Sequence, residues 1–302
     1  MPASGPTTAL PDVLHLAGLT ADVLAQVDHL VVGCGGFARE LVRFTGGASS
    51  VKDSAGQRVT EADRLIDSLL RERLTQLVPG STGYSEEGGR FGAEREGLRV
   101  RWSIDPVDGT RPALLGGAFG VSVGALVCDG RQTRAAVGWL YAPTLATLYR
   151  GILTGDFAEA RLNGDLVRLP KLAPLENCYL GVSSNWRSTF LTGCSLKLSA
   201  AGATSIHLTQ LLQPGSDVAA VALTRYRAYD VAGALVPAVA AGCAVYPLEM
   251  DRGGIASEPL DPLAYLAGGA RQPEALGPPV LVCRPEVADR LRERCGSPEQ
   301  HS

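Results

Sequence analysis

The residues best suited to metal chemistry stand in one short segment, Asp105–Thr110, which reads Asp-Pro-Val-Asp-Gly-Thr. Asp105 and Asp108 are three residues apart and flank a proline, so both carboxylates can turn towards one point. Magnesium prefers oxygen ligands and usually takes one or two carboxylates, with water and substrate phosphate completing its shell. The segment therefore indicates a magnesium site. A plain surface turn is the alternative, because Asp, Pro and Gly are common turn formers.

The end of the same segment, Gly109-Thr110, offers backbone N–H groups where a turn or helix begins. Such groups are unpaired donors at the positive end of the helix dipole, and they suit a phosphate. A metal site next to phosphate donors indicates phosphoryl chemistry.

Two other acidic segments are candidates for the same site. Glu86 and Glu87 form an acidic pair after a short hydrophobic approach, and Asp230 stands at the start of an otherwise apolar helix. Each has a simpler interpretation when taken alone. The glutamates fit a solvated loop, and the aspartate fits a helix N-cap.

These segments occur in the order typical of the inositol monophosphatase superfamily, which this sequence resembles. The four matching motifs are Val59–Asp63, Glu86-Glu87, Asp105–Thr110 and Tyr229–Ala232. The turn at Ala160–Gly164 is also similar. The resemblance spans about residues 25 to 250. It implies an α/β protein with the layered αβαβα sandwich of the inositol monophosphatase and fructose-1,6-bisphosphatase fold.

The resemblance also implies a set of magnesium ligands, for two or three ions in all. Glu86, Asp105 and the backbone carbonyl of Val107 would hold one ion. Asp105, Asp108 and Asp230 would hold another.

The same resemblance implies catalytic roles for three residues. Thr110 paired with Asp63, together with Glu86, would orient and deprotonate the attacking water. The N–H groups of Gly109 and Thr110 would hold the phosphate. No histidine or cysteine nucleophile is then needed, and none of the four histidines stands near these motifs.

The expected substrate is a small phosphate monoester of the histidinol phosphate, sugar or cyclitol phosphate class. Leu223 stands where the inositol phosphatases carry an acidic residue, and Ala113 where an aromatic one is common. Arg111 and the Ala234–Pro237 segment instead resemble the histidinol-phosphate phosphatase branch, so Arg111 is a candidate substrate contact. A 3′-phosphonucleotide or a specialised biosynthetic phosphate ester is the alternative substrate.

The pattern between residues 62 and 77 predicts a helix with one apolar face. Thr60 and Asp63 resemble a capping box at its start, and Pro79-Gly80 ends it.

Strand patterns dominate from about residue 99 to 169. Two tight-turn signals, Asp129-Gly130 and Asn163-Gly164, indicate an antiparallel sheet with helices packed on it. We therefore predict an α+β N-terminal lobe over residues 1–174. Residues 175–302 are predicted to form an α/β lobe that supplies Asp230 to a site between the lobes. The elements predicted there are strands at 178–183, 218–223, 244–248 and 279–283 and helices at 203–213, 231–241 and 286–294.

Composition limits the partners. A net charge of −3 lacks the basic excess typical of nucleic-acid or anionic-membrane binding. No apolar run approaches the ~20 residues that span a bilayer. The seven cysteines are scattered without a Cys-x-x-Cys pair, which indicates reduced core thiols. We expect a cytoplasmic protein, and a homodimer is possible because members of the family often form one.

Two other classes of function remain open. The Gly33–Ala38 segment fits Gly-x-Gly-x-x-Ala, and Asp53 follows about twenty residues later, as in a dinucleotide-binding fold. Close packing of a long helix predicted over residues 21–44 explains the glycines more simply. The second is a non-catalytic relative that binds a metal or a phosphate ester.

Overall fold

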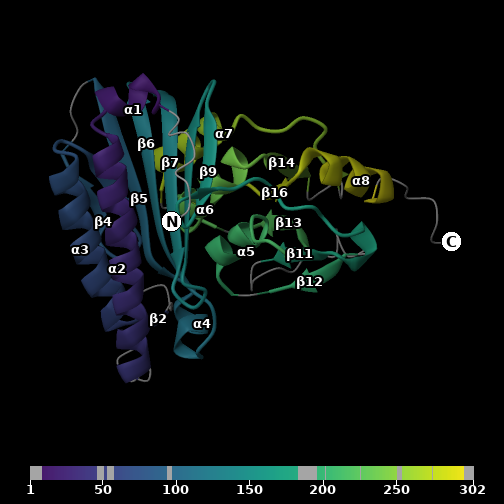
Figure 1. The fold of residues 1–302 in the computed structure, drawn as a ribbon, viewed down its shortest axis with the longest axis horizontal. Coiled ribbons are helices and arrows are strands. Elements are labelled where there is room, and N and C mark those ends of the chain that lie inside the picture. Colours follow the sequence, from purple (N-terminus) through teal and green to yellow (C-terminus); the bar gives the residue numbers. More distant parts are fainter. Residues whose placement is uncertain are drawn as a thin grey trace, which may run out of the picture.

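The computed structural model describes residues 9–45, 51–52, 58–93, 97–182, 196–200, 202–224, 226–249, 254–273 and 275–295. In these residues, layers of helix and sheet alternate: a helix pair, an eight-stranded sheet, a middle helical layer, a six-stranded sheet and a final helix (Figure 1). This is the predicted αβαβα order.

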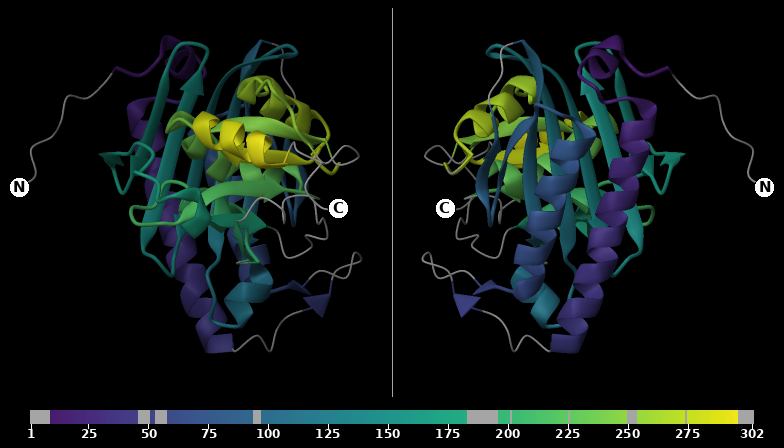
Figure 2. Two further views of the ribbon diagram at one scale, coloured as in Figure 1. Left: turned by 90° about the vertical axis from the view of Figure 1, so that its right-hand side faces the viewer. Right: turned by 90° about the vertical axis from the view of Figure 1, so that its left-hand side faces the viewer.

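The first layer is formed by α2 (Ala21–Thr45) and α3 (Glu61–Leu77), which lie side by side across one face of the large sheet (Figure 2, right). The predicted capping box is confirmed at the start of α3. The Thr60 N–H donates to Asp63 Oδ2 at 2.8 Å, and the Asp63 N–H donates to the Thr60 hydroxyl. Short helix α1 (Asp12–Leu16) precedes this pair.

The eight-stranded sheet has the order β10-β9-β8-β7-β6-β5-β3-β4. Its pairs are antiparallel except β3 with β5, which are parallel. The predicted Asn163-Gly164 turn is confirmed, with both residues at positive φ. At the other predicted turn, Asp129 pairs with Gln132, so the turn residues are Gly130-Arg131. The strands are β3 (Thr82–Ser85), β4 (Gly89–Gly92), β5 (Leu98–Asp108), β6 (Gly120–Asp129), β7 (Gln132–Ala142), β8 (Thr147–Thr154), β9 (Ala158–Leu162) and β10 (Asp165–Leu166).

The two faces of this sheet pack against different helices because side chains alternate along each strand. On β5, Trp102 and Ile104 belong to the core against α2 and α3. Ser103 and Asp105 therefore face the middle helical layer. The same alternation on β6 places Val121, Val123 and Ala125 in the core against α2 and α3, whereas Leu126 lies in the core beneath α6.

The middle layer is dominated by α6 (Ala228–Ala240), which lies directly on the large sheet. A row of paired glycines, Gly124, Gly138 and Gly151, crosses β6, β7 and β8 beneath it. A Cβ added at Gly138 would lie 2.7 Å from the Gly233 carbonyl oxygen, and one at Gly124 would lie 2.7 Å from Ala232 Cβ. Only glycine allows the helix to approach so closely. The short helices α5 (Thr204–Gln210) and α7 (Pro262–Arg271) complete the layer.

The second sheet has the order β12-β11-β13-β16-β14-β15 and is mixed. One of its faces joins the core beneath α6, and the other packs on α8 (Pro285–Cys295). The predicted strands at 178–183, 218–223, 244–248 and 279–283 are confirmed within a residue or two. The strands are β11 (Tyr179–Val182), β12 (Lys197–Ser199), β13 (Val218–Leu223), β14 (Ala244–Glu249), β15 (Gly254–Ile255) and β16 (Val280–Cys283).

The large sheet ends at Leu166 and the second begins at Tyr179, after the short turn η1 (Leu175–Asn177). Helix α6 nevertheless follows this junction and packs on the first sheet, so one apolar core includes residues from both parts. The division at residue 174 stays a prediction.

The glycine-rich segment Gly33–Ala38 lies inside the continuous helix α2, and the residues directly before it, from Ala21, belong to the same helix and not to a strand. A Cβ at Gly35 would meet the Tyr141 ring, whereas Gly33 and Gly36 face open space. Close helix packing therefore explains Gly35. The geometry lacks the strand-to-helix turn that cradles a dinucleotide, and Asp53 lies outside the described residues.

Two smaller expectations were also tested. Helices in the described part of the chain are all too short or too polar to cross a membrane. Five cysteines in this part are free and buried, as expected: Cys34, Cys128, Cys178, Cys243 and Cys283.

The glycine row generates a stability prediction. Gly138→Ala should destabilise the protein by about 1–3 kcal/mol, because the added methyl forces α6 away from the sheet. Gly155→Ala is the matched control, since nothing lies within 4 Å of its added Cβ. Urea unfolding midpoints measure both. Equal midpoints for the two variants would contradict the close-approach argument.

Candidate metal and phosphate site

Three carboxylates meet beside the start of α6. One oxygen each of Glu86, Asp105 and Asp230 lie within 4.8 Å of one another. They come from the loop after β3, from near the end of β5 and from the first turn of α6. Segments far apart in sequence thus form one acidic cluster, and its oxygen-only donor set fits a hard divalent cation.

Asp105 and Asp108 flank an irregular stretch at the end of β5. The regular pairing with β6 shifts between them, so Asp105 pairs with Ser122 and Asp108 with Gly120. The Val107 N–H donates to Asp105 Oδ1 at 3.1 Å. Both aspartates are buried. The Asp-Pro-Val-Asp segment is therefore the distorted end of a strand and not an exposed turn.

Glu86 is held in place by residues that were not predicted from the sequence. Its N–H donates to the Ile104 carbonyl at 3.0 Å, which ties the loop to β5. The neighbouring Ser85 hydroxyl donates to buried Asp67, which also pairs with Arg71 at 3.2 Å. The sequence contained one signal for Asp67: it stands four residues after Asp63, so both aspartates share one face of the predicted helix.

Asp230 occupies the third position of α6, so it is not the N-cap. Its Oδ2 accepts the Arg227 N–H at 2.6 Å. The adjacent Tyr229 ring stacks on Tyr84 of β3, with centroids 5.8 Å apart and planes 9° apart. The Arg227 guanidinium donates to the Tyr229 hydroxyl at 2.9 Å. These contacts hold the start of α6 against the strand that leads to Glu86.

Asp108 is held differently from the cluster of three. Its carboxylate accepts the N–H groups of Thr204, at 3.3 Å, and Ser205, at 2.6 Å, and also the Ser205 hydroxyl. These are the first residues of α5, so Asp108 ties β5 to that helix. Its predicted role as a metal ligand stays a prediction.

The predicted partners Asp63 and Thr110 are in contact. The Thr110 hydroxyl lies 3.0 Å from Asp63 Oδ1 and 3.2 Å from the Val107 carbonyl. Gly109, between strand β5 and helix α4 (Thr110–Leu114), has φ 89°. A side chain is strained in this left-handed conformation, and a Cβ there would lie 2.7 Å from Ala203 Cβ. Glycine is therefore required at this turn.

Burial and mutual repulsion raise the pKa values of the clustered acids. Burial and then the nearby Asp230 raise the pKa of Glu86 to about 8. Burial raises the pKa of Asp230 to about 7, and burial followed by the charge of Glu86 raises that of Asp105 strongly. Burial also raises the pKa of Asp63. A bound cation would act in the opposite direction and favour the carboxylates.

Arg111, the candidate substrate contact, lies in different surroundings from Ala113 and Leu223, the two departures from the inositol phosphatase pattern. Arg111 is exposed on α4, and Ala113 is buried in the core against α2 and α3. Leu223 is buried at the end of β13 within the core beneath α6. His207 is buried in α5, where its Nδ1 lies 3.2 Å from Gln210 Oε1.

Comparison with known proteins gives a family. Residues 21–274 match the model of the inositol monophosphatase family. An inositol-1-monophosphatase of Mycobacterium leprae is 29% identical over 233 residues, which cover 70% of this chain and 76% of that protein. A histidinol-phosphatase of Chlorobaculum parvum is 34% identical over 116 residues, 38% of this chain and 41% of that protein.

A solved structure is similar to this chain in fold. The inositol monophosphatase TM1415 of Thermotoga maritima superposes with a TM-score of 0.64 over 91% of this chain and 97% of that one, at 19% identity. This likeness is one of architecture and agrees with the alternating layers described above.

The raised pKa values generate a pH prediction for protein treated with a chelator. These acids bind protons more tightly in the folded chain than in the unfolded one, where their pKa is about 4. Their contribution to stability is therefore fully present below about pH 4. It is lost as pH rises through about 7 for Asp230 and about 8 for Glu86. Each proton of difference contributes about 1.4 kcal/mol per pH unit.

Urea unfolding across this pH range tests the prediction. Glu86→Gln should flatten the fall in stability between about pH 4 and 8, because it removes one acid and one repulsive neighbour. An unchanged slope in this variant would show that the cluster does not cause the pH dependence.

Proposed function

This chain belongs to the inositol monophosphatase family, and from that premise we propose that it is a magnesium-dependent phosphatase for a small phosphate monoester. The convergence of Glu86, Asp105 and Asp230 within 4.8 Å carries the proposal. Three acids held this close, with Asp105 fully buried, repel one another and are costly unless a cation or a proton compensates them.

The proposed ligand set is the one implied by the family. Glu86, Asp105 and the Val107 carbonyl would hold one magnesium, and Asp105, Asp108 and Asp230 another, with a third ion possible. Magnesium, when bound, lowers the pKa of a water molecule and neutralises charge on the phosphoryl oxygens. The oxygen-only cluster around buried Asp105 supports this choice of ion.

Asp63 and Thr110 are the proposed proton-handling pair. Thr110 donates its hydroxyl hydrogen to Asp63 at 3.0 Å, which leaves the threonine oxygen able to accept a hydrogen from the attacking water. Asp63 can then take the proton, and burial has already raised its pKa. Glu86 would help to orient the same water. The water oxygen forms a new bond to phosphorus while the ester phosphorus–oxygen bond breaks. The leaving alkoxide takes a proton from solvent water, and Asp63 returns its own proton to solvent.

The N–H groups of Gly109 and Thr110 are the proposed phosphate donors. They stand at the start of α4, where the first N–H groups have no acceptor within the helix. The left-handed turn at Gly109 is what directs the chain from β5 into this helix.

The proposed substrate is a histidinol phosphate, sugar phosphate or cyclitol phosphate. Burial of Leu223 in an apolar core argues against the acidic hydroxyl contact expected of an inositol phosphatase. Partial similarity to a histidinol-phosphatase supports histidinol phosphate, and exposed Arg111 is a candidate contact with it. A 3′-phosphonucleotide is the alternative. A bisphosphate nucleotidase CysQ of Haemophilus influenzae is 33% identical over 111 residues.

The proposed setting is the cytoplasm, without a nucleic-acid or membrane partner, and with a homodimer as the expected assembly. Light scattering of the purified chain at several concentrations measures the assembly. A monomer at every concentration would remove the dimer from the proposal.

A phosphate-release screen tests the function directly. The panel contains histidinol phosphate, inositol 1-phosphate, glucose 1-phosphate, fructose 1,6-bisphosphate and 3′-phosphoadenosine 5′-phosphate. Release should require magnesium and stop with a chelator. Release that is equally fast in the chelator would contradict a metal-dependent mechanism, and the preferred ester identifies the substrate class.

Asp105→Asn should lower kcat/KM on the order of 1,000-fold, as expected for losing several kcal/mol of transition-state stabilisation. Folding should be preserved, because this substitution removes charge from a crowded acidic cluster. Phosphate release and the urea midpoint measure the two effects. A folded variant with full activity would contradict the assignment of Asp105.

Thr110→Val should lower kcat about 100- to 10,000-fold, the range associated with proton transfer. The magnesium concentration for half-maximal activity should change little, since the hydroxyl faces Asp63. Thr110→Ser keeps the hydroxyl and is the matched control. Equal losses in both variants would assign Thr110 a packing role instead.

A further inference from the structure

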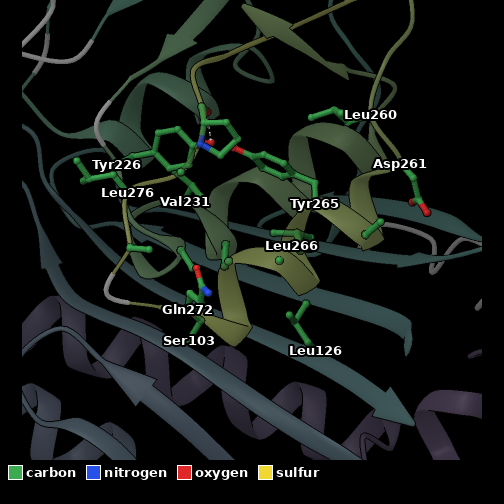
Figure 3. Close-up of a pocket in the computed structure, with 18 residues that line it drawn as sticks. Ser103, Leu126, Tyr226, Val231, Leu260, Asp261, Tyr265, Leu266, Gln272 and Leu276 are labelled. Carbon is green, nitrogen blue, oxygen red and sulfur yellow. Dashed lines mark hydrogen bonds between the residues drawn. The ribbon is translucent and has the colours of Figure 1, made fainter. Parts of the chain in front are cut away.

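A cavity lies between the large sheet, α6 and α7, next in sequence to residues of the acidic cluster (Figure 3). Its volume is about 500 Å³, within the range typical of small-molecule sites. Leu126 of the sheet, Val231 of α6 and Leu266 of α7 form its walls with Tyr226, Tyr265 and Leu276. None of the three clustered carboxylates lines it. The cavity is therefore a separate, mainly apolar space.

Two hydroxyl groups of this cavity have no partner among the described residues. The Ser103 hydroxyl is buried on the large sheet, where the residue is only 6% exposed, and the Tyr265 hydroxyl belongs to α7. The Tyr226 hydroxyl, by contrast, donates to the Pro278 carbonyl at 2.7 Å. Buried polar groups normally have a hydrogen-bond partner, so Ser103 and Tyr265 provide the places where a ligand would complete the hydrogen bonding.

We propose that this cavity binds a ring-sized apolar group that carries a polar edge, such as a hydroxyl or carbonyl. The ring would contact Leu126, Val231 and Leu276. The polar edge would bond to Ser103 or Tyr265. Apolar walls with a few placed polar groups are typical of small-molecule sites.

The position of the cavity allows two sources for this ring. Ser103 precedes Asp105 by two residues on the same strand face, and Val231 follows Asp230. The ring can thus be the leaving group of the phosphate ester, which rests on the proposed function. It can also be a separate molecule bound next to the site. Both share one recognition chemistry.

Binding of 1-naphthol, measured by calorimetry without magnesium or ester, tests the cavity independently of catalysis. Saturable binding should weaken at least about tenfold in Gly268→Leu, which adds a large side chain to a residue that lines the cavity and has no atom within 4 Å of its added Cβ. Gly33→Leu is the matched control, because it is also an exposed helical glycine with nothing within 4 Å. Absence of saturable binding, or equal binding by both variants, would overturn the proposal.

Ser103→Ala tests the polar contact. It should weaken 1-naphthol binding about fivefold, the effect of one lost hydrogen bond, without lowering the urea midpoint. The hydroxyl has no partner to lose in the free protein. Unchanged binding in Ser103→Ala and Tyr265→Phe together would overturn the assignment of the polar edge.

Kinetics with two esters distinguish the sources. If the ring is a leaving group, Gly268→Leu lowers kcat/KM for 1-naphthyl phosphate and leaves that for glycerol 2-phosphate unchanged. If it is a separate molecule, 1-naphthol binds equally well at saturating glycerol 2-phosphate, and the ratio of the two kcat/KM values is unchanged. Both results support the cavity. Failure to hydrolyse either ester counts against the proposed function only, because the binding experiment does not use it.

Discussion

The closeness of α6 to the large sheet determines the geometry of the acidic cluster. The helix rests on Gly124, Gly138 and Gly151, whose missing side chains let its backbone approach the strands. Asp230 is in the first turn of that helix, and Asp105 is on the strand next to the row. A helix displaced outward by ordinary side chains would carry Asp230 away from Asp105 and Glu86. The packing of α6 on the glycine row therefore determines the distances between the carboxylates.

The cluster itself opposes folding unless its charge is compensated. Buried like charges repel, and each raised pKa value reports the cost of ionising one of them. The surrounding contacts hold the acids together despite this repulsion. Ser85 bonded to Asp67 holds the Glu86 loop, and the stacked rings of Tyr84 and Tyr229 hold the start of α6. A pre-organised set of oxygen ligands is the result, and the proposed cation would offset the repulsion.

Local features of the chain were predictable because their causes are local. The Thr60–Asp63 capping box and the Asn163-Gly164 turn depend on residues within a few positions of each other. The meeting of Glu86, Asp105 and Asp230 was implied by resemblance to a family, since spacing alone left a turn, a loop and an N-cap as alternatives. The glycine row was not predictable, because it exists only once three strands are in register. Helix α7 was also missed, since Gly268-Gly269 lowers its intrinsic helix propensity.

The hydrogen bonds of Asp108 to α5 couple the proposed metal site to that helix. The same carboxylate that is predicted to touch a cation also accepts the N–H groups of Thr204 and Ser205. An ion that draws electron density from Asp108 weakens its hydrogen bonds to the helix. A shift of the helix, in turn, changes the position of the Asp108 carboxylate. Linkage makes this influence reciprocal. Exchange of the Thr204 and Ser205 amide hydrogens would then report cation occupancy from the middle layer of the molecule, without any substrate present.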